Sequence, residues 1–244
     1  MLDTLPRLLG ASVLVYALAA NAWALVRRGR GALPSFWRVV FPPVQALFML
    51  GPPYAGLLSG RITPAMAGFD LPSTARLWES AALPVAALLA VSGIGLALHR
   101  TLIAPRYPPG VLPAVRMRAR LSRPWGFSSV IFDALCYQAH WAFYRLAAAQ
   151  YLHDAPLGAA AGSLLVLFEW ALDPGWRGRL FQPGLGEEQW LLLGLLGFSA
   201  LLALLVPGFW LLLAVHAVLW LLWYTLLQRW YRSAAGATLD SGRE

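Results

Sequence analysis

Long apolar runs recur along this chain and constrain its fold more than any other feature. Seven runs of roughly 17 to 25 residues are long enough to cross a hydrocarbon core of about 30 Å. They lie at 8–26, 39–58, 81–98, 127–151, 157–172, 190–206 and 209–230. Because a backbone in lipid must satisfy its own hydrogen bonds, runs of this length predict helices. The sequence therefore predicts an all-α, polytopic integral membrane helix bundle with about seven transmembrane helices.

The number of spans depends on two of these runs. The run at 157–172 is short for a full crossing. The run at 39–58 contains two proline pairs, Pro42-Pro43 and Pro52-Pro53, and proline removes a helix hydrogen bond. We expect these pairs to break the second helix, so the range is about six to eight spans.

The composition fits lipid as the main solvent. Of the 244 residues, 59% are hydrophobic and 12% are charged, whereas a soluble domain carries roughly 25% charged residues. The formal net charge of +8 would suggest nucleic acid as the partner of a soluble protein. Here the basic residues cluster in loops between apolar runs. We therefore expect the lipid bilayer as the partner, with other membrane protein subunits as a further option, and no nucleic acid.

The arginines predict the orientation in the membrane, since the chain has no lysine. With seven spans, the arginine-rich segments all fall on one side, and the opposite side holds only Arg7, Arg61 and Arg76. The rich segments contain Arg27, Arg28, Arg30, Arg38, Arg100, Arg106, Arg116, Arg118, Arg120, Arg123, Arg177, Arg179, Arg229, Arg232 and Arg243. Basic loops stay in the cytoplasm. We expect a multi-pass protein of the cell membrane with its N-terminus outside and its C-terminus in the cytoplasm.

The chain divides into four regions. Residues 1–98 form an N-terminal three-helix membrane region, and residues 99–125 form a basic, proline-rich cytoplasmic loop. Residues 126–232 form a four-helix membrane core, and residues 233–244 form a short polar tail. Within the loop, residues 111–121 alternate apolar residues with arginine. This segment is either a helix lying on the membrane surface or a solvated connector.

Polar side chains inside the predicted spans of the core are the candidate functional residues: Asp133, Gln138, His140, Arg145, Glu169 and His216. Polar groups at membrane depth are costly and face the protein interior. On a helix at 127–151, Asp133, Tyr137, His140 and Tyr144 fall within about 60° of arc, and Gln138 and Arg145 form an adjoining strip. We expect Gln138 to hydrogen-bond to another helix.

Three of these residues make up the ligand set of a catalytic zinc site. His140, Glu169 and His216 supply two imidazoles and one carboxylate, which can hold zinc with one position open for water. In such a site Arg145 would steady a carboxylate or an oxyanion, and Asp133 or a bound water would handle protons. Zinc is the implied cofactor if the three side chains converge.

Two other interpretations use the same residues. An internal network of ion pairs and hydrogen bonds would hold the helices together, as polar groups often do between membrane helices. A transporter or proton path would need a continuous aqueous route and discontinuous helices. The two proline pairs in the second run are the only sign of such helices.

Small residues begin the fifth run. Gly158 and Gly162 are separated by three alanines, which forms a small-xxx-small pattern. Such patterns let two helix backbones approach closely. We therefore expect tight packing of another helix against this segment.

Around its polar residues the chain resembles the CPBP family of intramembrane glutamate proteases, also called the CAAX-protease and bacteriocin-processing or ABI family. The first motif of the family is E-E-x-x-x-R and the second is F-x-x-x-H. The third begins with histidine and ends in a polar residue, often Asn. Residues 140–145, 165–169 and 216–220 occupy these three patterns, and the resemblance covers roughly residues 127–230.

The same positions also depart from the family. Arg145 and His216 match the motifs directly, whereas His140 and Trp141 replace the two glutamates and Glu169 replaces the second-motif histidine. In the family a glutamate activates water, so the resemblance implies a CPBP-like membrane core that has lost catalysis. It implies a non-catalytic subunit or accessory factor of a membrane assembly. A metal-dependent intramembrane protease or hydrolase is the alternative, and a transporter or proton-conducting protein is the third.

Overall fold

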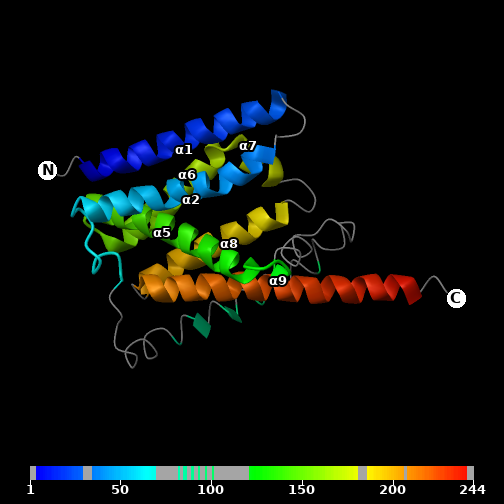
Figure 1. Ribbon diagram of the computed structural model, residues 1–244. Coiled ribbons are helices and arrows are strands. Elements are labelled where there is room, and N and C mark those ends of the chain that lie inside the picture. Colours follow the sequence, from blue (N-terminus) through cyan, green and yellow to red (C-terminus); the bar gives the residue numbers. More distant parts are fainter. Residues whose placement is uncertain are drawn as a thin grey trace.

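All regular secondary structure in the part of the chain that the structure describes is helical. A computed structural model describes residues 4–29, 35–69, 121–180, 186–205 and 208–240, together with isolated positions between 82 and 101. These ranges contain no strand, and their helices are α1 (Thr4–Gly29), α2 (Ser35–Leu58), α5 (Gly126–Leu152), α6 (Ala155–Leu172), α7 (Pro174–Leu180), α8 (Gly186–Leu205) and α9 (Phe209–Asp240) (Figure 1). The predicted all-α class is confirmed.

Four of these helices are long and apolar enough to cross a membrane. The qualifying segments are Leu5–Leu25, Ala155–Leu172, Glu188–Leu205 and Phe209–Leu226, in α1, α6, α8 and α9. Each coincides with a predicted span. Helices α2 and α5 form at two further predicted spans without reaching the same apolarity, and the predicted span at 81–98 lies outside the described residues apart from isolated positions. Four such helices fit an integral membrane protein.

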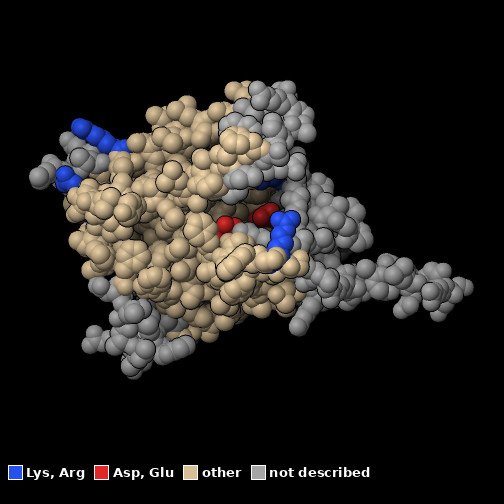
Figure 2. Space-filling model, in the orientation of Figure 1, with Lys and Arg blue, Asp and Glu red and all other residues tan. Residues whose placement is uncertain are grey.

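The outer surface of the bundle is apolar. Leu18 on α1, Leu47 on α2 and Leu164 on α6 are 63%, 72% and 64% exposed. Figure 2 shows charged side chains of the described residues near the two ends of the molecule, with a broad uncharged band between them on the face in view. Large apolar areas that no protein covers are expected where a surface faces lipid.

Helix α2 runs unbroken through both proline pairs, so the predicted break in the second span is wrong. The helix includes Pro42, Pro43, Pro52 and Pro53. Each proline lacks an N–H, and the carbonyl group four residues earlier therefore loses its helical partner. Membrane helices tolerate this loss where neighbouring helices support them, and α2 packs against both α1 and α5.

Helix α5 is the centre of the bundle. It contacts α1, α2, α6 and α9, and its most extensive contact is with α6. Only His153 and Asp154 separate the two helices in the chain. The Asp154 side chain caps α6 by accepting a hydrogen bond from the Leu157 N–H at 2.7 Å. The two helices therefore form a tight antiparallel hairpin.

Two glycines allow the close approach of α5 and α6. A Cβ atom added to Gly158 would lie 2.3 Å from the Cα atom of Ala149. One added to Gly162 would lie 2.4 Å from the backbone nitrogen of Arg145. Real Cβ atoms do not come this close to a neighbouring backbone, so larger residues would force the helices apart. The predicted small-xxx-small packing is confirmed.

The segment 59–69 hydrogen-bonds to the C-terminal end of α5 and to the N-terminal end of α9. The Phe209 N–H donates to the Gly68 carbonyl at 3.0 Å, and Gln150 Nε2 donates to the Arg61 carbonyl at 3.4 Å. In Figure 1 this end of the bundle also contains the start of α1. Helices α1, α6 and α9 run in one direction, and α2, α5 and α8 run in the other (Figure 1).

Two predicted segments outside the core, the polar tail at 233–244 and the surface helix at 111–121, differ from the structure or fall mostly outside the described residues. Helix α9 continues to Asp240, so the part of the predicted polar tail at 233–240 is helical. The predicted surface helix at 111–121 lies outside the described residues except for its last position. A short helix, α7, directly follows α6 and begins after Asp173, whose Oδ1 accepts a hydrogen bond from the Gly175 N–H at 2.7 Å.

Candidate functional site

A buried acid–imidazole pair joins α5 to α6. His140 Nε2 lies 2.8 Å from Glu169 Oε2, and the two side chains are 4% and 1% exposed. Tyr144, one turn along α5 from His140, donates a hydrogen bond to the other carboxylate oxygen, Glu169 Oε1. The Tyr144 hydroxyl also lies 2.9 Å from Ser12 Oγ on α1. We call these four residues the α1–α5–α6 network.

The proton positions in this network follow from its donors and acceptors. A tyrosine hydroxyl has one proton. Tyr144 uses this proton for Glu169, so Ser12 donates to the Tyr144 oxygen. Both oxygens of Glu169 then have a partner, one an imidazole and the other a phenol. The described side chains alone satisfy this buried carboxylate, as burial requires.

A second network joins α5 to α8 and α9. Gln138 Nε2 and His216 Nδ1 lie 2.8 Å apart, and Gln138 Oε1 accepts a hydrogen bond from Ser199 Oγ at 2.9 Å. Arg145 Nη1 donates to Ser199 Oγ at 2.8 Å, and Arg145 Nη2 donates to Gln138 Oε1 at 3.4 Å. We call these four residues the α5–α8–α9 network. Gln138 is confirmed as an interhelical hydrogen-bonding residue.

Aromatic rings enclose both histidines. The His216 ring stacks on Trp141 with centroids 5.1 Å apart and packs against Trp220 at 5.3 Å. The His140 ring lies 5.4 Å from the ring of Phe48 on α2. His140 Nδ1 and His216 Nε2 are buried without a hydrogen-bond partner in the described ranges. Among the described residues, each imidazole therefore makes its polar contact through one nitrogen only.

The three predicted metal ligands do not gather at one point. His140 and Glu169 belong to the α1–α5–α6 network, whereas His216 contacts Gln138 in the other network. No group of three or more His, Cys, Asp or Glu side chains among the described residues is arranged to hold a metal ion. The reason lies in helix geometry, because Gln138 and His140 are two positions apart on α5 and point about 200° apart around its axis.

The two predicted catalytic residues also lie apart from the acid–imidazole pair. Arg145 belongs to the α5–α8–α9 network, where its hydrogen bonds go to Ser199 and Gln138. Asp133 is half-buried in the second turn of α5, about 10 Å along the helix axis from His140. The predicted internal network would join His140, Arg145 and Glu169. The structure pairs His140 with Glu169 and places Arg145 in the other network.

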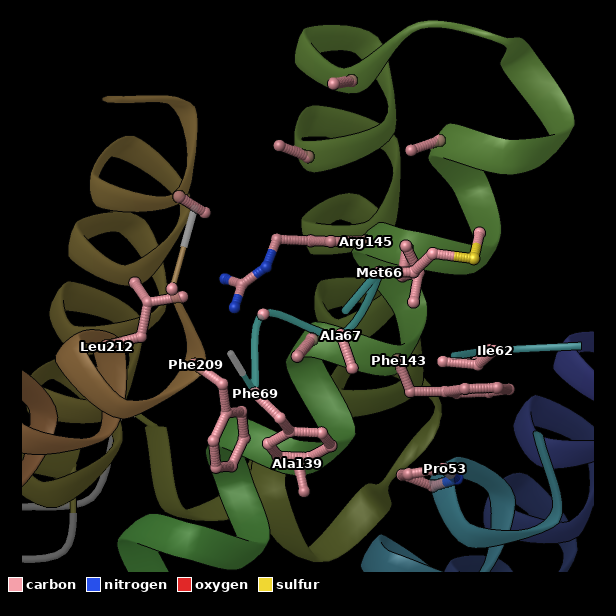
Figure 3. A pocket seen from close by; sticks show the side chains of 18 of the residues that line it. Pro53, Ile62, Met66, Ala67, Phe69, Ala139, Phe143, Arg145, Phe209 and Leu212 are labelled. Atoms are coloured by element: carbon pink, nitrogen blue, oxygen red, sulfur yellow. The ribbon is translucent and has the colours of Figure 1, made fainter. Parts of the chain in front are cut away.

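Arg145 lines a cavity of about 220 Å³ between α2, α5, α6, α8, α9 and the segment 59–69. The other described side chains that line it are apolar, and they include Ile62, Phe143 and Phe209 (Figure 3). Neither His140 nor Glu169 borders this space. The cavity and the acid–imidazole pair are therefore separate features of the bundle.

Sequence reasoning missed two members of the networks, Ser12 and Ser199. Both are buried, at 4% and 5% exposure. A single uncharged serine in an apolar helix is common in membrane proteins, so neither residue stood out. Tyr144 was placed on the His140 face of α5 but was given no role.

The two networks and the cavity define what the site can do chemically. The acid–imidazole pair can hold a proton between two helices, and Arg145 can pair with an anion inside the cavity. Comparison with protein-family models, with curated proteins and with solved structures finds no match.

Proposed function

We propose that the protein is an integral membrane protein with a CPBP-like core, and that it acts as a non-catalytic subunit or accessory factor of a membrane assembly. The observation that carries this proposal is that the three predicted zinc ligands lie in two separate hydrogen-bond networks. His140 bonds to Glu169, and His216 bonds to Gln138 on the opposite face of α5. A hydrolytic zinc site needs about three protein ligands around one ion, and the described residues supply no such group.

The polar side chains act instead as an internal frame. The first network connects α1, α5 and α6, and the second connects α5, α8 and α9. In lipid the hydrophobic effect contributes little to helix association, so packing and interhelical hydrogen bonds hold the helices together. Bonds of this kind contribute about 0.6–2 kcal/mol each. Two networks that share α5 would keep the bundle in one arrangement.

The contact between His140 and Glu169 supports the CPBP-like core. The resemblance implies a glutamate where His140 stands and a histidine where Glu169 stands. Exchanging an acid and an imidazole between two packed helices keeps their contact. It also removes the glutamate that would activate water in the family. The exchange is therefore consistent with a core that is retained while catalysis is lost.

We also propose that the N-terminus lies outside and the C-terminus lies in the cytoplasm. The start of α1 and the segment 59–69 share one end of the bundle, and α7 and the starts of α5 and α8 lie at the other (Figure 1). The first end carries Arg7 and Arg61, whereas the other end has Arg177 and Arg179 on α7, Arg123 before α5, Arg27 and Arg28 at the end of α1 and Arg38 at the start of α2. The arginine-rich end is the cytoplasmic one by the positive-inside rule.

Metal content tests the non-catalytic assignment. Zinc in the purified full-length protein is measured by plasma mass spectrometry beside His140→Gln, His216→Gln and the control His153→Gln, an exposed histidine at the end of α5. We expect no stoichiometric zinc in any of the four proteins. About one zinc per chain, lost in His140→Gln or His216→Gln and kept in His153→Gln, would favour the hydrolase instead.

Particle size tests the role as a subunit. The protein is extracted in mild detergent from its native membranes and, separately, from membranes of an unrelated host. We expect the native particle to be larger and to contain a second, reproducible polypeptide beside the 26.7 kDa chain. Particles of equal size from both sources would contradict the proposal.

A further inference from the structure

Arg145 carries a buried positive charge that no acidic side chain in the described ranges neutralises. The residue is 6% exposed. Its two hydrogen-bond partners, Ser199 and Gln138, are both neutral. A guanidinium has five N–H donors, so these two bonds leave most of them without an acceptor among the described residues. A buried charge without a counter-charge is strongly unfavourable, and an anion beside Arg145 would relieve it.

The cavity provides room for such an anion. In Figure 3 the Arg145 side chain extends from α5 into the open space toward α8 and α9, where Leu212 and Phe209 lie. The volume of about 220 Å³ exceeds the roughly 150 Å³ of an apolar cavity that binds benzene. A molecule of several carbon atoms and one small polar group would fit.

The walls of the cavity select for an apolar molecule with a single negative charge. Arg145 is the one charged side chain among the described lining residues. Ala155 and Ala159 on α6 and Ala203 on α8 line it with methyl groups, which leave space between the two helices. Ile62 and Met66 cover it from the segment 59–69. The ligand therefore meets one cation and otherwise hydrocarbon.

We propose that this cavity binds the carboxylate end of a single-chain fatty acid, with Arg145 as its counter-ion. A guanidinium and a carboxylate form two parallel charge-assisted hydrogen bonds. One arginine balances a carboxylate, whereas a phosphate monoester carries about −1.5 to −2 charge at neutral pH. The apolar walls receive the first methylene groups, and the rest of the chain extends toward the lipid.

Binding of decanoate to the full-length protein in nanodiscs of uncharged lipid tests this proposal. Isothermal titration calorimetry compares decanoate with decanol, which has the same chain without the charge. We expect decanoate to bind at least about tenfold more tightly than decanol. Arg145→Gln should lower the affinity for decanoate at least about tenfold. Arg177→Gln, an exposed arginine on α7 away from the cavity, should leave it unchanged.

A second variant tests the cavity without touching the charge. Ala203→Phe fills the space from α8 and should abolish decanoate binding. Leu201→Phe adds bulk on the exposed face of the same helix, where Leu201 is 55% exposed, and should bind decanoate like the wild type. If Arg145→Gln does not fold, this pair of variants and the comparison of ligands decide the question.

Four results would overturn the proposal. They are no binding of decanoate to the wild type, equal affinity for decanoate and decanol, undiminished binding by a folded Ala203→Phe variant, and a tenfold preference for decyl phosphate over decanoate. The last result would assign the cavity to a phosphate group instead of a carboxylate. None of them depends on whether the protein is a subunit of a larger assembly, so the two proposals fail independently.

Discussion

His140 Nε2 and Glu169 Oε2 lie 2.8 Å apart across the interface of α5 and α6, with both side chains buried. Tyr144 donates to the second oxygen of the same carboxylate. Removing any one of these groups would leave a buried polar partner without its bond, which costs more than the bond itself contributed. The three side chains therefore act as one unit in stabilising the hairpin.

Loss of either member of the pair should destabilise the protein strongly. His140→Ala and Glu169→Ala should each lower the free energy of unfolding by about 3–5 kcal/mol, because each leaves a buried partner unpaired. The double variant should cost clearly less than the two single effects added together. Unfolding by sodium dodecyl sulfate in mixed micelles measures these values, with half-buried Glu188→Gln as the control. Additive effects would show that the two residues do not interact.

Adding one methyl group between α5 and α6 should separate them. Gly158→Ala and Gly162→Ala place a Cβ atom at 2.3 Å and 2.4 Å from the α5 backbone. Overpacking of this kind costs about 1–3 kcal/mol. Gly197→Ala on α8 has no neighbour within 4 Å and should be neutral or stabilising. Thermal unfolding compares the three variants, and equal stability of Gly162→Ala and Gly197→Ala would contradict the described approach of the helices.

Removal of the Tyr144 hydroxyl should weaken the α1–α5–α6 network. Tyr144→Phe leaves Glu169 Oε1 and Ser12 without the phenol, and we expect a loss of about 1–3 kcal/mol. Tyr151→Phe, at a tyrosine that is 66% exposed, should change stability little. The same unfolding assay measures both. A Tyr144→Phe variant as stable as Tyr151→Phe would show that the hydroxyl contributes nothing.

Labelling of single cysteines should reveal the orientation in the membrane. Cys136 is buried and is replaced by alanine to give a background without cysteine. Thr63→Cys, exposed in the segment 59–69, should react with a membrane-impermeant maleimide in intact cells. Gly178→Cys, exposed on α7, should react only after the membrane is permeabilised. The reverse pattern would place the N-terminus in the cytoplasm.

The helices could be predicted well because their signal is local. Each of α1, α6 and α8 begins and ends within about four residues of an apolar run, since the thickness of the hydrocarbon core sets the length of a spanning helix. Helix α9 begins with its run at Phe209 but continues past it to Asp240. The proline pairs of α2 misled the prediction for the same reason. A local rule counts the lost hydrogen bonds at Pro42 and Pro52, but it does not include the neighbouring helices that support the backbone.

The site could be predicted only in part, because it depends on which helices surround α5. Of the six polar residues predicted to lie inside, Asp133 is half-buried, and the other five are buried: Gln138, His140, Arg145, Glu169 and His216. The hydrogen-bond partners of these residues were not predicted, since the sequence does not tell which helix packs against each face of α5. His140 faces α6 and Gln138 faces α8 and α9, so residues two positions apart take part in different networks.

The two-residue connection between α5 and α6 bears on how the nascent chain enters the bilayer. Helix α5 carries Gln138, His140 and Arg145, and a single arginine at the centre of an isolated helix costs about 2.5–3.5 kcal/mol on insertion. The apolar α6 follows immediately and brings Glu169 to His140. We expect α5 to wait at the insertion machinery until α6 has been synthesised. The hairpin would then move into lipid as one body, with its acid and imidazole already paired before they meet the acyl chains.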